Sequence, residues 1–246
     1  MDCVFHKTFT LEAIHTDCFG RLKPSALLYF AQEAAGAHCV ALGLDNDALA
    51  EKNLFWVILR NRVQITRLPQ IGETIIVKTW PMPTTRSAYP RATAAYDETG
   101  RELFCCTSLW ALVGRSTRAM VLPGKSGVAL EGIVLGNELP APESIVPQEL
   151  ENAALFRIGY SQLDRNFHMN NTRYLDWVDD LLPSAFHQTH PVQCFTICYL
   201  FEVLESQEIT LKWQLSDDNS LLVNGYRAAE NDTQRPTRVF AAKLQF

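Results

Sequence analysis

The sequence predicts an α+β protein built from two tandem domains, each with one long helix and an antiparallel sheet. Three observations lead to this prediction. Each half of the chain contains one long run with apolar residues at helical spacing, and four β-like segments follow each run. The stretch between the two halves, residues 123–152, is rich in Pro, Gly and Glu. The repeated order of elements favours a duplicated domain over two unrelated ones.

The first half opens with an alternating strand at 5–11 and a turn at Asp17–Gly20. Pro24 suits the first position of a helix, and Gly43 can end that helix. One face of the helix carries Leu27, Phe30, Ala31, Ala34 and His38. The strands expected after it are 55–65, 73–80, 88–97 and 102–113.

The second half repeats this order. A strand is expected at 155–160, a turn at Asp164, and a helix at 172–182 that Pro183 closes. The strands expected after it are 195–201, 209–215, 221–227 and 238–246. We therefore expect an N-terminal domain over 1–125, a linker over 126–152 and a C-terminal domain over 153–246.

Composition narrows the class of protein. The 246 residues are 47% hydrophobic, enough for a substantial core, and the net charge of -5 argues against a general nucleic-acid binder. No run approaches the roughly 20 apolar residues of a membrane helix, and the first residues lack a signal core. We expect a cytoplasmic protein without membrane insertion. The seven cysteines show no paired C-x-x-C elements, so we expect reduced thiols, no metal site and no cofactor.

The most specific motif places an acid, an amide and an imidazole at every second position: Asp164, Asn166 and His168. An extended segment would project all three from one face, just before a helix whose N-terminus favours negative charge. The alternative is an ordinary turn followed by a helix cap, because Asp and Asn are common in both. Two more asparagines, Asn170 and Asn171, follow the motif.

This motif is the most specific of several segments in which the chain resembles the bacterial-type acyl-acyl carrier protein thioesterases. The resemblance lies in "DCFGRLKPSALLYFAQEAAGAH", "RLPQIGETIIVKTWP" and "DETGRELFCCTSLWALV" in the first half, and in "LDRNFHMNNTRYLDW" and "YLFE" in the second. It implies a double hot-dog fold, in which two tandem domains each wrap an antiparallel sheet around a long helix. It also implies hydrolysis of fatty acyl-acyl carrier protein.

The resemblance further implies where the functional residues lie. It implies catalysis in the second domain by Asp164, Asn166, His168 and Glu202. Plant members carry a cysteine where this chain has Val203, so a cysteine nucleophile is not expected. The acyl chain is expected in the first domain.

The other expected contacts are with the substrate and its carrier. The candidate substrate contacts are Ala31, Ala34, His38, Trp56, Asn170 and Asn171. The implied partner is acyl carrier protein, with Arg165 and Arg173 as docking candidates, and the resemblance leaves a homodimer open.

Hydrolysis of a thioester needs an activated water and a site for the charge that develops on the carbonyl oxygen. An imidazole, with a reference pKa of about 6.5, can relay the proton when a carboxylate holds its tautomer. Backbone N–H groups near Asn170 and Asn171 are candidate oxyanion donors. Two other functions stay open: a coenzyme A thioesterase, and a hot-dog module that binds acyl groups without hydrolysing them. The segment 119–126 meets a relaxed phosphate-loop pattern but carries Pro123 and lies near the linker, so we reject that function.

Overall fold

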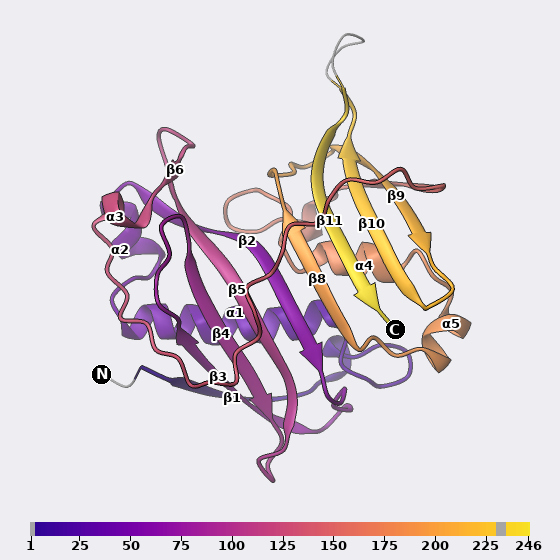
Figure 1. Ribbon diagram of the computed structural model, residues 1–246, viewed down its shortest axis with the longest axis horizontal. Helices are drawn as coiled ribbons and strands as arrows, with labels where there is room; N and C mark the ends of the chain where they lie inside the picture. The colour runs from indigo at the N-terminus through magenta and orange to yellow at the C-terminus, as the bar shows by residue number, and fades with distance from the viewer. Residues whose placement is uncertain (1–2, 230–234) are drawn as a thin grey trace. The chain divides into compact units, whose positions relative to one another are not determined.

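A computed structural model of the chain describes residues 3–229 and 235–246. The chain forms two compact units, unit 1 (Met1–Pro142) and unit 2 (Glu143–Phe246), and each has its own antiparallel sheet and helices (Figure 1). No helix in the part of the chain that the structure describes is both long and apolar enough to cross a membrane.

The sheet of unit 1 has the strand order β1-β3-β4-β5-β2, and a short strand, β6, pairs with β5. The strands are β1 (Phe5–Thr10), β2 (Leu54–Ile65), β3 (Thr74–Pro81), β4 (Tyr89–Tyr96), β5 (Glu102–Gly114) and β6 (Met120–Val121). The helices are α1 (Pro24–Ala41), α2 (Asn46–Glu51) and α3 (Pro123–Ser126), with a 3-10 turn at Ala13–His15. The predicted strands of the first half are confirmed to within one or two residues.

Helix α1 is the long helix predicted for this half and covers one face of the sheet (Figure 1). Pro24 stands at its first position, where the missing N–H costs nothing, and Gly43 follows its end with a φ of 67°. The predicted apolar face is buried: Leu27 and Ala34 are fully enclosed, and Phe30 is 1% exposed.

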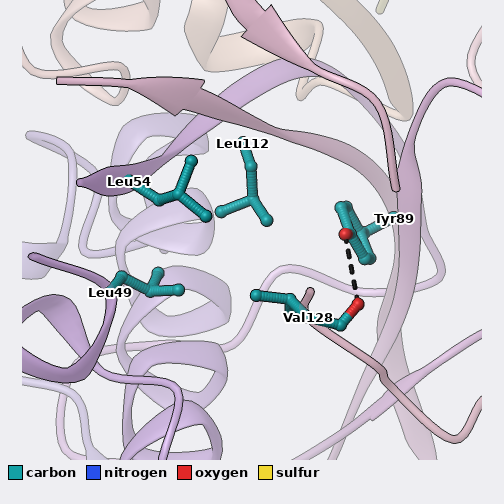
Figure 2. Packing of buried hydrophobic residues seen from close by; sticks show 5 residues of the cluster. All are labelled: Leu49, Leu54, Tyr89, Leu112 and Val128. Atoms are coloured by element: carbon teal, nitrogen blue, oxygen red, sulfur yellow. Dashed lines mark hydrogen bonds between the residues drawn. The ribbon is translucent and has the colours of Figure 1, made fainter. Parts of the chain in front are cut away.

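The segment after α3 also packs against the unit 1 sheet. Figure 2 shows a cluster in which Val128 packs with Leu49, Leu54, Tyr89 and Leu112, and the Tyr89 hydroxyl donates to the Val128 carbonyl. Further along, Ile133 and Leu139 pack on a second cluster that contains Trp80. The beginning of the 126–152 stretch, expected as a linker, therefore belongs to the core of unit 1.

The sheet of unit 2 has the strand order β8-β11-β10-β9-β7. The strands are β7 (Asn152–Arg157), β8 (Cys194–Tyr199), β9 (Glu208–Leu215), β10 (Ser220–Arg227) and β11 (Thr237–Gln245). The helices are α4 (Arg173–Asp179) and α5 (Ser184–Thr189), with a 3-10 turn at Tyr160–Gln162. The strand expected at 155–160 thus begins and ends about three residues earlier.

Helix α4 packs on the sheet through aromatic rings, with Tyr174 against Phe240 and Trp177 against Phe156. It spans seven residues, so the prediction of a helix over 172–182 was too long. The residue before a proline disfavours helical geometry, and Pro183 caps α5 instead. Between α4 and α5 the chain forms 3-10-type hydrogen bonds that join residues three apart, such as Leu182 N–H to the Asp179 carbonyl at 3.2 Å.

Candidate active site

The motif at 164–168 forms a closed turn between the 3-10 turn and α4. One carboxylate oxygen of Asp164 accepts the backbone N–H of Asn166 at 2.7 Å and that of His168 at 3.1 Å. The Asp164 N–H donates to the His168 carbonyl at 2.7 Å, and Phe167 takes a φ of 62°. A short acidic side chain favours this geometry because it can bond backbone N–H groups two and four residues ahead.

This turn corrects the extended geometry expected for the motif. A single left-handed residue, Phe167, breaks the alternation that would project Asp164, Asn166 and His168 together. The Asp164 carboxylate is bonded to the backbone of the other two residues instead. These backbone bonds fix the position from which the His168 side chain projects.

A second segment completes the site. The Met169 N–H donates to the Val203 carbonyl at 2.8 Å, and His168 forms a β-bridge with Leu204. This pairing brings His168 Nε2 to 3.1 Å from Glu202 Oε2. The His168 side chain is 15% exposed and that of Glu202 is 49% exposed, so the pair opens to solvent on the carboxylate side.

The asparagines of the motif differ in what they can offer a ligand. Asn166 is exposed, and its side-chain amide makes no hydrogen bond to the described residues. The Asn170 N–H donates to the Gln162 carbonyl at 2.8 Å, so it is not an oxyanion donor, which corrects that expectation. Its side chain instead accepts from the N–H and hydroxyl of Thr172. The Asn171 N–H has no partner among the described residues, and the Asn171 carbonyl accepts the Tyr199 hydroxyl at 2.8 Å.

The two docking candidates lie on either side of the turn. Arg165 is exposed. Arg173 begins α4, is 47% exposed and pairs with Asp176 at 3.1 Å. An exposed pair of this kind contributes little to stability.

Unit 1 contains the same turn without the histidine. Asp17 accepts the backbone N–H groups of Phe19 and Arg21, both at 2.9 Å, and Gly20 takes a φ of 77°. The Leu22 N–H donates to the Pro69 carbonyl at 2.9 Å, as Met169 does to Val203 in unit 2. Arg21 stands where unit 2 has His168, and its side chain pairs with Asp17 at 2.9 Å. Because the aspartate forms this turn where no imidazole is present, its bonds to the backbone serve the turn itself.

The substrate contacts predicted in the first domain lie in unit 1. Ala31 is 9% exposed, Ala34 is fully enclosed and His38 is 2% exposed, all on α1. Burial, and secondarily the nearby Arg91 guanidinium, lower the pKa of His38 to about 4, so the imidazole is neutral at neutral pH. The partly buried Trp56 donates from its indole to the Leu44 carbonyl at 3.3 Å.

Sequence analysis did not identify Tyr174 as part of the site. It is 4% exposed on α4, and burial followed by the nearby Asp164 carboxylate raises the pKa of its phenol. The helical spacing in the sequence indicates that Tyr174 is buried, but it does not indicate that Tyr174 lies near Asp164.

Neither the turn at 164–168 nor the segment around Glu202 contains a cysteine. Val203 is fully buried at the position next to Glu202. Burial raises the pKa of the Cys105 thiol to about 11 and also raises that of Cys106. Cys194 and Cys198 lie on β8. Among the described residues, no group of three or more His, Cys, Asp or Glu side chains could hold a metal ion.

Two family models match the chain. The acyl-ACP thioesterase N-terminal domain matches residues 2–122, and the acyl-ACP thioesterase C-terminal domain matches residues 146–241. A dodecanoyl-[acyl-carrier-protein] hydrolase of Cinnamomum camphora is 26% identical over 223 residues, which are 82% of this chain and 58% of that protein. The chain thus spans less than two thirds of that relative.

Two solved structures share the fold. An acyl-ACP thioesterase from Bacteroides thetaiotaomicron has a TM-score of 0.83 at 24% identity, covering 100% of this chain and 98% of that one. The 12:0-ACP thioesterase from Umbellularia californica has a TM-score of 0.83 at 22% identity, covering 100% and 97%. At such identities the likeness shows the fold, and it confirms the predicted double hot-dog class.

Proposed function

Because the chain belongs to the acyl-ACP thioesterase family, we propose that it hydrolyses the thioester of fatty acyl-acyl carrier protein. The products are the free fatty acid and the carrier protein with its thiol restored. The observation that carries the proposal is the contact between His168 and Glu202, because these two residues stand where the family resemblance implies the catalytic groups. We assign the acyl-binding role to unit 1 and the catalytic role to unit 2.

In this mechanism His168 takes a proton from a water molecule, and Glu202 holds the imidazole through Nε2 and stabilises the imidazolium that forms. The water oxygen attacks the carbonyl carbon, and the carbonyl oxygen becomes an oxyanion. The Asn171 N–H is the candidate donor to that oxyanion, and we assign to the exposed amide of Asn166 the role of orienting the water or the substrate.

The tetrahedral intermediate then collapses with cleavage of the bond between carbon and sulfur. The proton on His168 passes to the departing sulfur, so the enzyme returns to its starting state. A thiol, with a reference pKa of about 8.5, leaves with little acid assistance. The most demanding step is therefore the activation of water, which is the step that the His168–Glu202 pair supports.

The carrier is the second part of the proposal. Arg165 and Arg173 are the candidates for contacting acyl carrier protein, which is acidic in general, because both are exposed beside the catalytic turn. Replacement of both by glutamine should raise KM for the carrier substrate more than it lowers kcat.

The test measures hydrolysis of the same acyl groups attached to acyl carrier protein and to coenzyme A. The proposal predicts a higher kcat/KM for the carrier-protein substrates. A higher value for coenzyme A would make the protein a coenzyme A thioesterase. Binding of both without turnover would indicate a non-catalytic acyl-binding module.

A further inference from the structure

A row of polar side chains crosses the interior of unit 1 on three adjacent strands. Arg91 on β4 lies opposite Ser108 on β5, and Ser108 lies opposite Asn61 on β2. Residues directly opposite in antiparallel strands share a face of the sheet. Arg91 contacts His38, so this is the face that α1 covers. The three side chains are 5%, 6% and 2% exposed, respectively.

Arg91 brings a positive charge into this interior without a carboxylate. Its Nη1 lies 3.2 Å from His38 Nδ1 and 3.2 Å from Thr79 Oγ1, and its Nη2 lies 4.0 Å from Cys39 Sγ. Among the described residues it forms no ion pair. The low pKa of His38 keeps the imidazole neutral, so the imidazole accepts a hydrogen bond and leaves the charge uncompensated. Burial of an uncompensated cation is unfavourable.

Asn61 provides a second and independent observation. Its side-chain N–H₂ group is enclosed and has no hydrogen-bond partner among the described residues. Its oxygen has only a weak contact with Cys106 Sγ at 3.9 Å. Buried amides are normally paired, and an unpaired one marks a place where another polar atom fits.

Between Arg91 and Asn61, Ser108 is already satisfied. Its hydroxyl donates to the Arg91 carbonyl at 3.3 Å and accepts the Trp110 indole N–H at 2.9 Å. The donor without a partner in the row is therefore the Asn61 amide, and Arg91 adds a positive charge that no carboxylate neutralises. On α1, the small and fully enclosed Ala34 lies one turn before His38 on the same face.

We propose that Arg91 and Asn61, with His38, form a binding site for an oxygen substituent, a hydroxyl or a carbonyl, on the acyl chain of the substrate. The proposal rests on the thioesterase function and on the acyl-binding role of unit 1. An unsubstituted chain would leave the Asn61 amide without an acceptor. An oxygen on the chain accepts from this amide, its partial negative charge is favoured by the Arg91 cation, and the protein then favours oxygenated acyl groups over unsubstituted ones of the same length.

The experiment compares the full-length protein on acyl-carrier thioesters of one chain length. The chains are unsubstituted, or carry one hydroxyl or one oxo group, with the position of the group varied along the chain. We expect at least one oxygenated substrate to have a kcat/KM about tenfold above the unsubstituted one, the size of one good hydrogen bond. No preference at any position would overturn the inference.

Failure of the proposed function gives a different result, which is that no thioester is hydrolysed. In that case the affinity for free oxygenated and unsubstituted fatty acids, measured by calorimetry, tests the site directly. Tighter binding of an oxygenated acid supports the site, and equal binding rejects it.

Substitutions test whether the preference for oxygenated substrates depends on the polar row of unit 1. Asn61→Leu keeps a similar shape and removes the unpaired amide, so the ratio of kcat/KM for the oxygenated to the unsubstituted substrate should fall about tenfold. The melting temperature should stay the same or rise, because an unpaired buried group is lost. Asn224→Leu is the matched control, because Asn224 is also fully buried with both amide atoms unpaired, but on β10 of unit 2. The inference is rejected if Asn61→Leu keeps the ratio, or if Asn224→Leu lowers it equally.

Arg91→Lys and Arg91→Met provide a second comparison. Lysine keeps the charge and should keep part of the preference, whereas methionine should abolish it. If the Arg91 variants do not fold, the Asn61 and Asn224 pair decides.

Discussion

Substitution of Asp164 separates a role in the turn from a role in the chemistry. One Asp164 oxygen accepts two backbone N–H groups at 2.7 and 3.1 Å, and Asp17 makes the same bonds in unit 1, where no imidazole is present. Asparagine can keep both bonds through its side-chain oxygen, whereas alanine loses both. We therefore expect Asp164→Asn to keep kcat/KM within about tenfold and Asp164→Ala to lose about a hundredfold, because His168 is then misplaced.

The loss of stability follows from the same two bonds. A hydrogen bond to a charged group contributes about 1.5–3 kcal/mol when well formed. Asp164 is only partly buried, so we expect Asp164→Ala to cost about 2 kcal/mol in total. For a chain of this size that corresponds to a fall of roughly 4–8 °C in melting temperature. Asp164→Asn should cost less than half as much.

The assay measures steady-state hydrolysis of an acyl-carrier thioester, with a thermal melt of each variant. Asp17→Ala is the matched control: it removes the same bonds in unit 1 and should lower the melting temperature while kcat stays within about threefold. The reasoning fails if Asp164→Asn melts like the wild type and loses as much activity as Asp164→Ala. The Asp164 charge would then act in the reaction, as a base or on the water.

Three further predictions test other parts of the site. Each of the seven cysteines should tolerate replacement by serine with activity retained, since neither the turn at 164–168 nor the segment around Glu202 contains a cysteine; a folded but inactive variant would restore a cysteine nucleophile. Ala34→Phe should shift the acyl preference to shorter chains, because each methylene excluded costs about 0.8 kcal/mol; a uniform loss on all chain lengths, or a lost fold, would mean that Ala34 only packs the core. The folded-state pKa of His38 is lowered to about 4, so the unfolded chain binds its proton first as pH falls below 6.5. The free energy of unfolding should therefore decrease by about 2 kcal/mol more for the wild type than for His38→Gln between pH 6.5 and pH 4, and parallel curves would contradict it.

The sequence was sufficient to predict the strands of unit 1 and helix α1, because the alternation of apolar and polar residues, Pro24 and Gly43 each act on the local backbone. It was insufficient for the end of α4, where the run of apolar residues continued beyond the helix and only Pro183 marked a break. Spacing placed Asp164, Asn166 and His168 in one motif, but the left-handed Phe167 turned an extended segment into a closed turn.

Long-range contacts set the remaining limits of sequence analysis. The pairing of His168 with Glu202 depends on a β-bridge between segments more than 30 residues apart, which no local pattern specifies. The occupied N–H of Asn170 depends on the Gln162 carbonyl in the same way. The polar row of unit 1 follows from the register of β2, β4 and β5, which residue identities alone do not give.

The most direct test of the account is the rate at which His168→Ala and Glu202→Gln hydrolyse acyl-acyl carrier protein, with circular dichroism to verify the fold. Alanine removes the imidazole that takes the proton, and glutamine keeps the shape of Glu202 but loses the charge that stabilises the imidazolium. The account predicts that both variants fold and that each loses about a hundredfold or more in kcat. Near-wild-type turnover by either folded variant would remove that residue from the mechanism and contradict the central claim that the His168–Glu202 pair activates the water.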